Sequence, residues 1–258
     1  MLIDANAYVG HWPFRKLGGN TLEGLDATAR ETGITHMCVA NLHGVFYKDA
    51  MQANRELSEL AGVYRGETVM LPFAIINPAY PAWREDMKRC VEELGFKGVE
   101  LCPVYHGYQL RKQGAEAVER AGELGVPVRI LAEFENYRQQ HRLDVFREPD
   151  TEDLTELLRM TRRTALILNG FAPTMQQTLV SAAAARENTY FDICRLDSFV
   201  IHSFEDMVGK IGAGRLCFGT LSPFYSVEPN LIKLRFACTE PGQVDAIAYQ
   251  NLRKHLQS

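Results

Sequence analysis

The sequence lacks the marks of several large protein classes. Its six cysteines form no Cys-x-x-Cys pair, and no two of its seven histidines have zinc-finger spacing. No apolar run approaches the roughly 20 residues that cross a bilayer. Lys and Arg number 28 against 32 Asp and Glu, which gives a formal charge of −4. We therefore expect neither a nucleic-acid partner nor a membrane partner.

The start of the chain also lacks a basic segment followed by an apolar stretch, because Asp4 and Asn6 interrupt the first apolar residues. We therefore expect a cytoplasmic protein whose thiols are reduced and mostly buried. The hydrophobic fraction of 46% and the charged fraction of 23% are ordinary for a globular chain, and they exclude a disordered or collagenous one.

The 258 residues allow one large α/β barrel or two small domains. No linker or block of charge divides the chain. Short apolar runs typical of buried parallel strands recur, and a helical pattern follows each. The expected strands cover 1–6, 36–40, 69–76, 98–102, 126–132, 164–168, 190–194 and 215–220.

Apolar residues at three-to-four spacing predict the helices between these strands. Thr151 is the expected N-cap of a helix over 150–163, and Gly95 and Gly125 are expected to end two others. The remaining predicted helices include 22–29, 53–61, 87–94, 115–124, 175–185, 204–209, 229–238 and 244–256.

Eight strand–helix units in about 250 residues predict a (β/α)8 TIM barrel. We expect it to be distorted and to form a single α/β domain over 1–258. A doubly wound sheet is the alternative. It is less favoured because the turn after the first strand reads Gly10-His11-Trp12-Pro13 instead of the Gly-x-Gly-x-x-Gly of dinucleotide-binding folds.

Several segments resemble one known family. They are Ile3-Asp4, Asn77-Pro78, Glu93-Leu94-Gly95-Phe96-Lys97-Gly98-Val99-Glu100-Leu101, Leu124-Gly125-Val126-Pro127-Val128, Phe218-Gly219-Thr220 and Asn251-Leu252-Arg253. On these segments the chain resembles the amidohydrolase-related proteins (amidohydrolase family 2), in particular the branch of metal-dependent decarboxylases and lactone hydrolases. The resemblance implies the barrel, a site at its C-terminal mouth that binds a small-molecule substrate, and possible assembly as a homodimer.

The chain departs from the family where the family binds its metal. The first-strand Asp-x-His-x-His motif has Asn6 and Tyr8 in place of its histidines. Leu131 and Asn169 stand where the fifth and sixth strands carry histidine, and Leu221 replaces the aspartate of the eighth strand. Leucine offers no lone pair, and amides and phenols are weak ligands for transition metals. The resemblance therefore implies degenerate metal-binding motifs, and we assign no metal ligand.

Polar residues are expected at the strand ends that form the barrel mouth. Three of them, His106, Glu100 and Asp192, are candidates for acid–base catalysis. His106 is the strongest, because the family often presents a loop histidine to substrate. The candidates for substrate binding are Asn6, Tyr8, His11, Arg15, His43, Asn169, Arg195 and Thr220.

Each candidate also has a structural interpretation. Asn6, Tyr8 and Asn169 can bind a ligand or satisfy one another as a polar plug. Arg15 can clamp an anionic substrate or stack on Trp12.

The carboxylates Glu100 and Asp192 can instead form ion pairs with Arg15, Arg129 or Arg195. Cys102 and Cys194 can act as nucleophiles beside His106 or lie in the core as buried thiols.

Three functions remain open. The first is a hydrolase or decarboxylase that acts on a small carboxylated or cyclic substrate without the family's usual metal. The second is a non-catalytic relative that binds a small molecule or a partner protein. The third is a hydrolase with an unconventional zinc or manganese site, for which His11, His43, His106 and Glu100 are the available donors.

Overall fold

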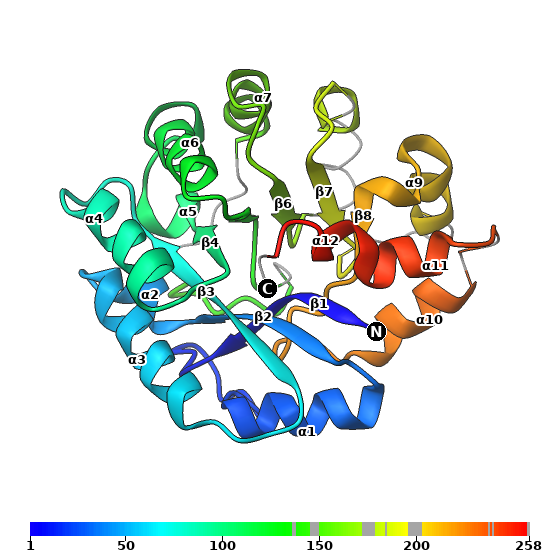
Figure 1. Cartoon of the computed structure of the whole chain (residues 1–258), viewed down its shortest axis with the longest axis horizontal. Helices are drawn as coiled ribbons and strands as arrows, with labels where there is room; N and C mark the ends of the chain where they lie inside the picture. The colour runs from blue at the N-terminus through cyan, green and yellow to red at the C-terminus, as the bar shows by residue number, and fades with distance from the viewer. Residues whose placement is uncertain are drawn as a thin grey trace.

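Eight parallel strands lie side by side in chain order at the centre of the protein (Figure 1). The computed structural model describes residues 1–258 except 136–137, 145–149, 172–178, 184, 196–202, 237, 239 and 257–258. The strands are β1 (Ile3–Val9), β2 (His36–Asn41), β3 (Val69–Ile76), β4 (Gly98–Leu101), β5 (Val128–Leu131), β6 (Leu166–Asn169), β7 (Thr189–Asp192) and β8 (Leu216–Cys217).

The segment that follows β8 bonds to β1 and nearly closes the sheet into a barrel. The N–H of Ala5 donates to the carbonyl of Phe218 (2.9 Å), and the N–H of Tyr8 donates to the carbonyl of Ser222 (2.8 Å). Parallel pairing joins each strand to the next from β1 to β8. The single-domain (β/α)8 barrel expected from the sequence is confirmed, and the structure shows that it is nearly closed.

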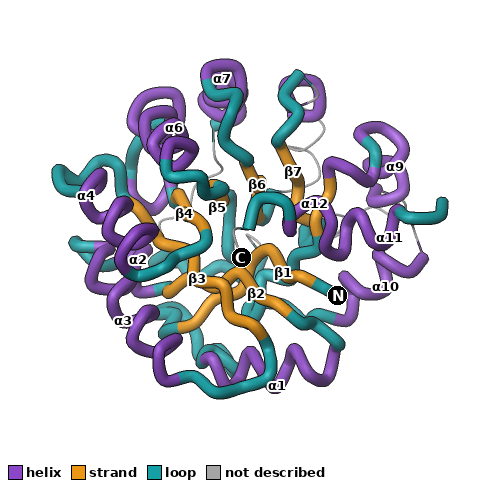
Figure 2. The backbone as a smooth tube through the Cα atoms, in the orientation of Figure 1, coloured by secondary structure: helices purple, strands orange, loops and turns teal. Residues whose placement is uncertain are grey.

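Helices surround the strands (Figure 2). They are α1 (Leu22–Thr32), α2 (His43–Phe46), α3 (Ala50–Val63), α4 (Trp83–Lys88), α5 (Pro103–His106), α6 (Ala115–Glu123), α7 (Thr151–Met160), α9 (Ser203–Ile211), α10 (Glu228–Phe236), α11 (Gln243–Asp245) and α12 (Asn251–Arg253). Further short helical segments are η1 (Arg89–Glu93), η2 (Leu110–Gly114), η3 (Ala213–Arg215) and η4 (Ala246–Gln250). Of the helix predicted over 175–185, residues 179–183 are helical, and 175–178 and 184 lie outside the described residues. No described helix is both long and apolar enough to cross a membrane.

The helix ends follow local chemistry. Gly95 and Gly125 have φ angles of +71° and +72°, which confirms the left-handed glycines expected after two helices. The N-cap expected at Thr151 is wrong by one residue. Asp150 caps α7, and its carboxylate accepts hydrogen bonds from two first-turn N–H groups at 2.9 and 3.4 Å. A carboxylate also suits the positive end of the helix dipole.

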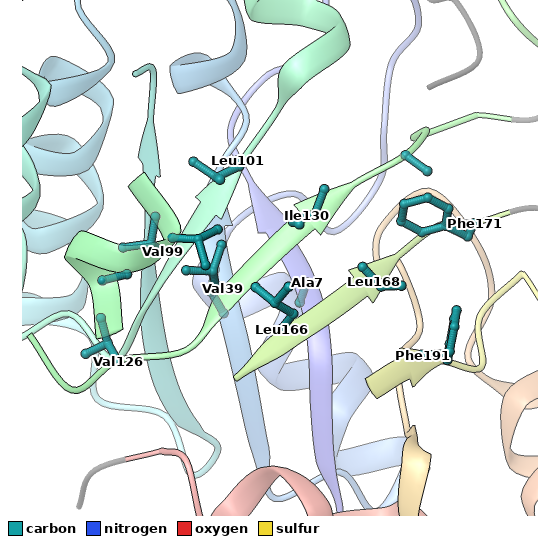
Figure 3. Packing of buried hydrophobic residues seen from close by; sticks show 14 of the residues in the cluster. Ala7, Val39, Val99, Leu101, Val126, Ile130, Leu166, Leu168, Phe171 and Phe191 are labelled. Atoms are coloured by element: carbon teal, nitrogen blue, oxygen red, sulfur yellow. The ribbon is translucent and has the colours of Figure 1, made fainter. Parts of the chain in front are cut away.

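Alternate residues of each strand face opposite ways. Val99 and Leu101 of β4, with Ile130 and Leu168 from β5 and β6, belong to the apolar layer between strands and helices (Figure 3). Glu100, between the two β4 residues, therefore points into the barrel. The same alternation brings polar residues of β5 and β6 inside.

A bulge changes this alternation in β1. The pairing of β1 with β2 shifts register between Asp4 and Ala7. Ala5 and Tyr8 both pack in the interior cluster, whereas Ala7 packs outside. The bulge turns the neighbours Ala5 and Asn6 both toward the barrel interior. Tyr8, two residues beyond Asn6, faces the interior as the i, i+2 spacing predicts.

Candidate functional site

Asn6 lies at the centre of a set of hydrogen bonds inside the barrel. Its Nδ2 donates to Oδ1 of Asn169 and to Oδ2 of Asp192, both at 2.5 Å. Its Oδ1 accepts the N–H of Leu221, also at 2.5 Å. The side chain thus links the middle of β1 to the ends of β6 and β7 and to the segment that follows β8.

Tyr8 extends these contacts to β4. Its O–H donates to Oε1 of Glu100 (2.6 Å) and its oxygen accepts from Nδ2 of Asn169 (2.7 Å). Nη2 of Arg129 donates to Oε2 of Glu100 (2.6 Å), and its Nη1 donates to one carbonyl each of β1 and β2 (2.6 and 3.0 Å). The ion pair considered from the sequence for Glu100 and Arg129 is confirmed.

Asp4 anchors the base of this arrangement. Its Oδ1 accepts the N–H groups of Asn6 and Thr220, each at 3.0 Å, and its Oδ2 accepts the hydroxyl of Thr220 at 2.5 Å. Burial raises the pKa of Asp4 to about 7, although the hydrogen bonds from Thr220 oppose that rise. Thr220, a candidate for substrate binding, is thereby bonded to the protein itself. We call Asp4, Asn6, Tyr8, Glu100, Arg129, Asn169 and Asp192 the interior network.

Burial governs protonation in the interior network. It raises the pKa of Tyr8 well above its ordinary value and also raises the pKa of Asp192. Burial alone would lower the pKa of Arg129, but the facing Glu100 raises it. Tyr8 is therefore a neutral hydrogen-bond donor, and Arg129 is a permanent cation whose charge Glu100 balances.

Aromatic rings and Leu221 cover the interior network on the mouth side. The ring of Phe134 lies 5.0 Å from that of Tyr8, and the rings of Phe134 and Phe224 stack at 5.0 Å. Trp12 packs against both, at 5.0 and 5.1 Å. We call Trp12, Phe134 and Phe224 the aromatic lid. Beneath it five side chains are 0% exposed: Asn6, Tyr8, Glu100, Arg129 and Asn169.

Glu135 holds the aromatic lid in place. Its Oε2 accepts from Nε1 of Trp12 at 3.0 Å, and its Oε1 forms an ion pair with Arg15. The guanidinium of Arg15 lies 5.8 Å from the ring of Phe224. Arg15 thus braces the lid through Glu135, a residue that no sequence motif singled out.

The candidate histidines lie apart from the interior network. A ring nitrogen of His106, Nε2, hydrogen-bonds the carbonyl of Gly44 (3.1 Å), and burial lowers the pKa of His106 to about 4. His43 contacts Glu56 through Nδ1 (2.9 Å) and accepts the N–H of His11 at Nε2 (3.0 Å). The structure does not bring the three histidines together with Glu100. Among the described residues, no group of three or more His, Cys, Asp or Glu is arranged to hold a metal.

The remaining candidates have partners within the protein. Arg195 forms an ion pair with Glu133 and donates to the hydroxyl of Tyr225 at 2.9 Å. Burial raises the pKa values of Cys102 and Cys194 well above the ordinary thiol value. Both thiols are therefore protonated at neutral pH, which is the state of a core cysteine and not of an activated nucleophile.

The residues at the family's metal-ligand positions do not fit a divalent cation. Asn6 donates both amide hydrogens to side-chain acceptors, and its oxygen, the only ligating atom of the amide, already accepts the N–H of Leu221. The side chains of Leu131 and Leu221 are buried in the interior cluster. Leu221 has a φ of +58°, a conformation that is costly for a bulky residue. The side chain of Asn6 is thus engaged in hydrogen bonds within the protein, and Leu131 and Leu221 present only hydrocarbon.

These features define a (β/α)8 barrel whose mouth holds a buried polar network. The family profile described as amidohydrolase matches residues 19–254. The chain therefore belongs to the amidohydrolase family. No curated protein matches it.

Solved structures share the fold at low sequence identity. A Staphylococcus aureus protein assigned as an amidohydrolase is 14% identical, with a TM-score of 0.75 over 99% of both chains. A dihydroxybenzoic acid decarboxylase from Polaromonas sp. JS666 is 15% identical, with a TM-score of 0.74 over 98% of this chain and 96% of that one. A 5-carboxyvanillate decarboxylase from Sphingomonas paucimobilis is 11% identical, with a TM-score of 0.69 over 99% and 98%.

Proposed function

We propose that this chain is a non-catalytic member of the amidohydrolase family, in which the interior network replaces the metal-centred site. One observation carries the proposal. The polar side chains at the mouth satisfy one another at 2.5–2.7 Å beneath the aromatic lid, and those of Asn6, Tyr8 and Asn169 are fully buried. This is the polar plug that the sequence left as an alternative to a ligand site.

The acid–base candidates support the same conclusion. A catalytic acid or base must reach the proton that it transfers. Glu100 accepts from Tyr8 and Arg129, and Asp192 accepts from Asn6 and from backbone N–H groups. His106 is bonded to a carbonyl. Catalysis by Glu100 or Asp192 would require the interior to open and these bonds to break, and catalysis by His106 would require the loss of its bond to Gly44.

Metal content is the first test. A related decarboxylase structure contains manganese and the inhibitor 2-nitroresorcinol, so manganese is the metal to add. We expect the protein purified without chelators to hold less than about a tenth of an equivalent of zinc or manganese, because a site lacking imidazole, thiolate and free carboxylate has little affinity. Stoichiometric manganese in a paramagnetic-resonance titration would overturn the proposal and favour the unconventional metal site.

Turnover is the second test, with 2,6-dihydroxybenzoate and 5-carboxyvanillate, the compounds that name the related decarboxylases. We expect carbon dioxide release at the rate of buffer alone, with or without added manganese. Turnover that is lost in His106→Asn and kept in His141→Asn, an exposed mouth histidine, would instead establish the metal-free hydrolase or decarboxylase. Light scattering on the same sample tests the homodimer that the family resemblance implies.

A further inference from the structure

A groove of about 380 Å³ lies on the outer wall of the barrel, away from the interior network. It runs between α7 and the helical residues 179–183, which follow it around the ring of helices (Figure 1). Leu158 and Ala182 give it apolar lining, and Ser181 adds a hydroxyl group. Three arginines also line the groove and give it positive charge: Arg159, Arg162 and Arg186.

The positive charge of the groove is only partly balanced. Arg186 is 3% exposed, and its donors are bonded to neutral acceptors within the protein. Nε donates to the carbonyl of Thr161 (2.6 Å), Nη1 to the carbonyl of Asn188 (2.9 Å) and the hydroxyl of Thr189 (3.0 Å), and Nη2 to the carbonyl of Thr164. Arg186 therefore adds charge to the wall of the groove, and the exposed Arg159 and Arg162 supply the donors that a ligand can reach. Burial lowers the pKa of Arg186 to about 10, so it remains a cation at neutral pH. No carboxylate is among the described residues that line the groove.

Arg159 is the one groove arginine with a described ion pair, through Nη1 to Glu156 at 2.7 Å. Cations also continue beyond the groove. A neighbouring hollow of about 110 Å³ is lined by Lys210 and Arg215, and Arg215 donates to the carbonyl of Ala183 at 2.9 Å, in the same helical segment that borders the groove. A chain of net charge −4 thus concentrates positive charge on one part of its wall.

We propose that this groove binds the phosphate group of a small molecule or of a lipid headgroup. Guanidinium groups match the oxygens of phosphate in pairs of charge-assisted hydrogen bonds. The volume equals that of roughly a dozen liquid waters, which is enough for a phosphate and a small apolar body against Leu158 and Ala182. The proposal is independent of the proposed function, because it uses none of the mouth residues.

The test is calorimetric titration of the full chain with inorganic pyrophosphate. We expect saturable one-to-one binding that weakens as salt rises. Arg162→Gln is expected to weaken binding by about tenfold, because it removes a charge-assisted contact. Glu156→Gln is expected to tighten it by about two- to threefold, because Arg159 loses its competing partner. The matched control is Arg163→Gln, an exposed neighbour outside the groove lining, which should leave binding unchanged.

Vesicles distinguish the two sources of phosphate. Co-sedimentation with phosphatidylcholine vesicles that contain phosphatidic acid, lost in Arg162→Gln, supports a lipid headgroup. Pyrophosphate binding without co-sedimentation supports a soluble ligand. Absence of saturable binding in both arms, or equal weakening by Arg162→Gln and Arg163→Gln, would overturn the proposal. None of these outcomes depends on whether the barrel mouth has catalytic activity.

Discussion

At the scale of single residues, the buried Glu100–Arg129 ion pair contributes to the stability of the barrel interior. Both side chains are 0% exposed, and two charges withdrawn from water are stable only when they face each other and their remaining donors are bonded. Arg129 meets this condition through Glu100 and two strand carbonyls. Loss of either partner leaves an uncompensated charge in the interior.

Arg129→Met is therefore expected to lower the free energy of unfolding by about 3–5 kcal/mol, as broken buried pairs do. Urea denaturation measures it. The double variant Glu100→Leu, Arg129→Met should lose less than the sum of its single variants, because neither charge then remains alone. Arg120→Met removes the surface pair with Glu123 and should cost no more than about 1 kcal/mol. Equal costs for the buried and surface variants would refute the role of the pair.

Asp4 makes stability depend on pH. Its pKa of about 7 in the folded protein exceeds the value of about 3.9 in an unfolded chain. Between these two values the folded state holds a proton that the unfolded state releases, so stability falls as pH rises.

Asp4→Asn abolishes this titration and keeps an amide oxygen to accept the N–H groups of Asn6 and Thr220. From pH 5 to pH 7, wild type is expected to lose on the order of 2 kcal/mol relative to Asp4→Asn. Urea denaturation at several pH values measures the difference between the two proteins. A difference that does not change with pH would show that Asp4 is charged throughout this range.

At the scale of elements, Asp153 connects α7 to η2, which lies about 40 residues earlier in the chain. It lies in the first turn of α7, and its carboxylate accepts the N–H groups of Leu110 (2.5 Å) and Arg111 (2.8 Å) at the start of η2. The amide of Leu110 is buried with it. One carboxylate thus accepts hydrogen bonds from two N–H groups that have no partner within their own helical segment.

Asp153→Ala is expected to cost about 2–3 kcal/mol, because it leaves a buried N–H group without its partner. Asp150→Ala at the N-cap of the same helix is the control and should cost about 1 kcal/mol. Hydrogen exchange should place the loss at Leu110 and Arg111 in the first variant only. Faster exchange of these two amides in Asp150→Ala as well would assign the effect to fraying of α7.

The order of the elements could be predicted from the sequence, because buried parallel strands read as apolar runs. The end of β8 could not. Its predicted range 215–220 shortens to Leu216–Cys217, since Phe218 donates its N–H to the carbonyl of Ile247 in the last helical turns. Such a contact between distant segments leaves no local pattern.

The candidate site could likewise be predicted only in part, because its contacts join residues that are far apart in the sequence. The positions of Asn6, Tyr8 and Asn169 at strand ends followed from spacing, and their mutual bonding was one of two interpretations. The roles of Asp4 and Glu135 were missed, because a bulge positions one and a loop positions the other. Asp4 opens the first-strand motif, but the spacing of that motif does not reveal its bond to Thr220, and Glu135 belongs to no motif.

At the scale of the whole molecule, the barrel is closed at both ends. The aromatic lid covers the mouth, and α12 packs at the opposite end, near the centre of the ring of helices (Figure 1). Leu252 of α12 is 1% exposed within the interior cluster. Asn251 donates to the carbonyls of Ala213 and Leu216, both at 2.8 Å.

This closure predicts that the last helical turn stabilises the entire barrel and not only its own segment. Leu252→Ala is expected to lower the free energy of unfolding by about 2–5 kcal/mol, the cost of a cavity in a packed core. Arg253→Ala, on the exposed side of the same segment, should cost no more than about 0.5 kcal/mol. A single urea transition, with hydrogen exchange accelerated in β1 and β7 as well as in the C-terminal segment, is the expected result. Acceleration confined to 251–256 would mean that the segment frays independently, and that the strands hold the interior network closed without it.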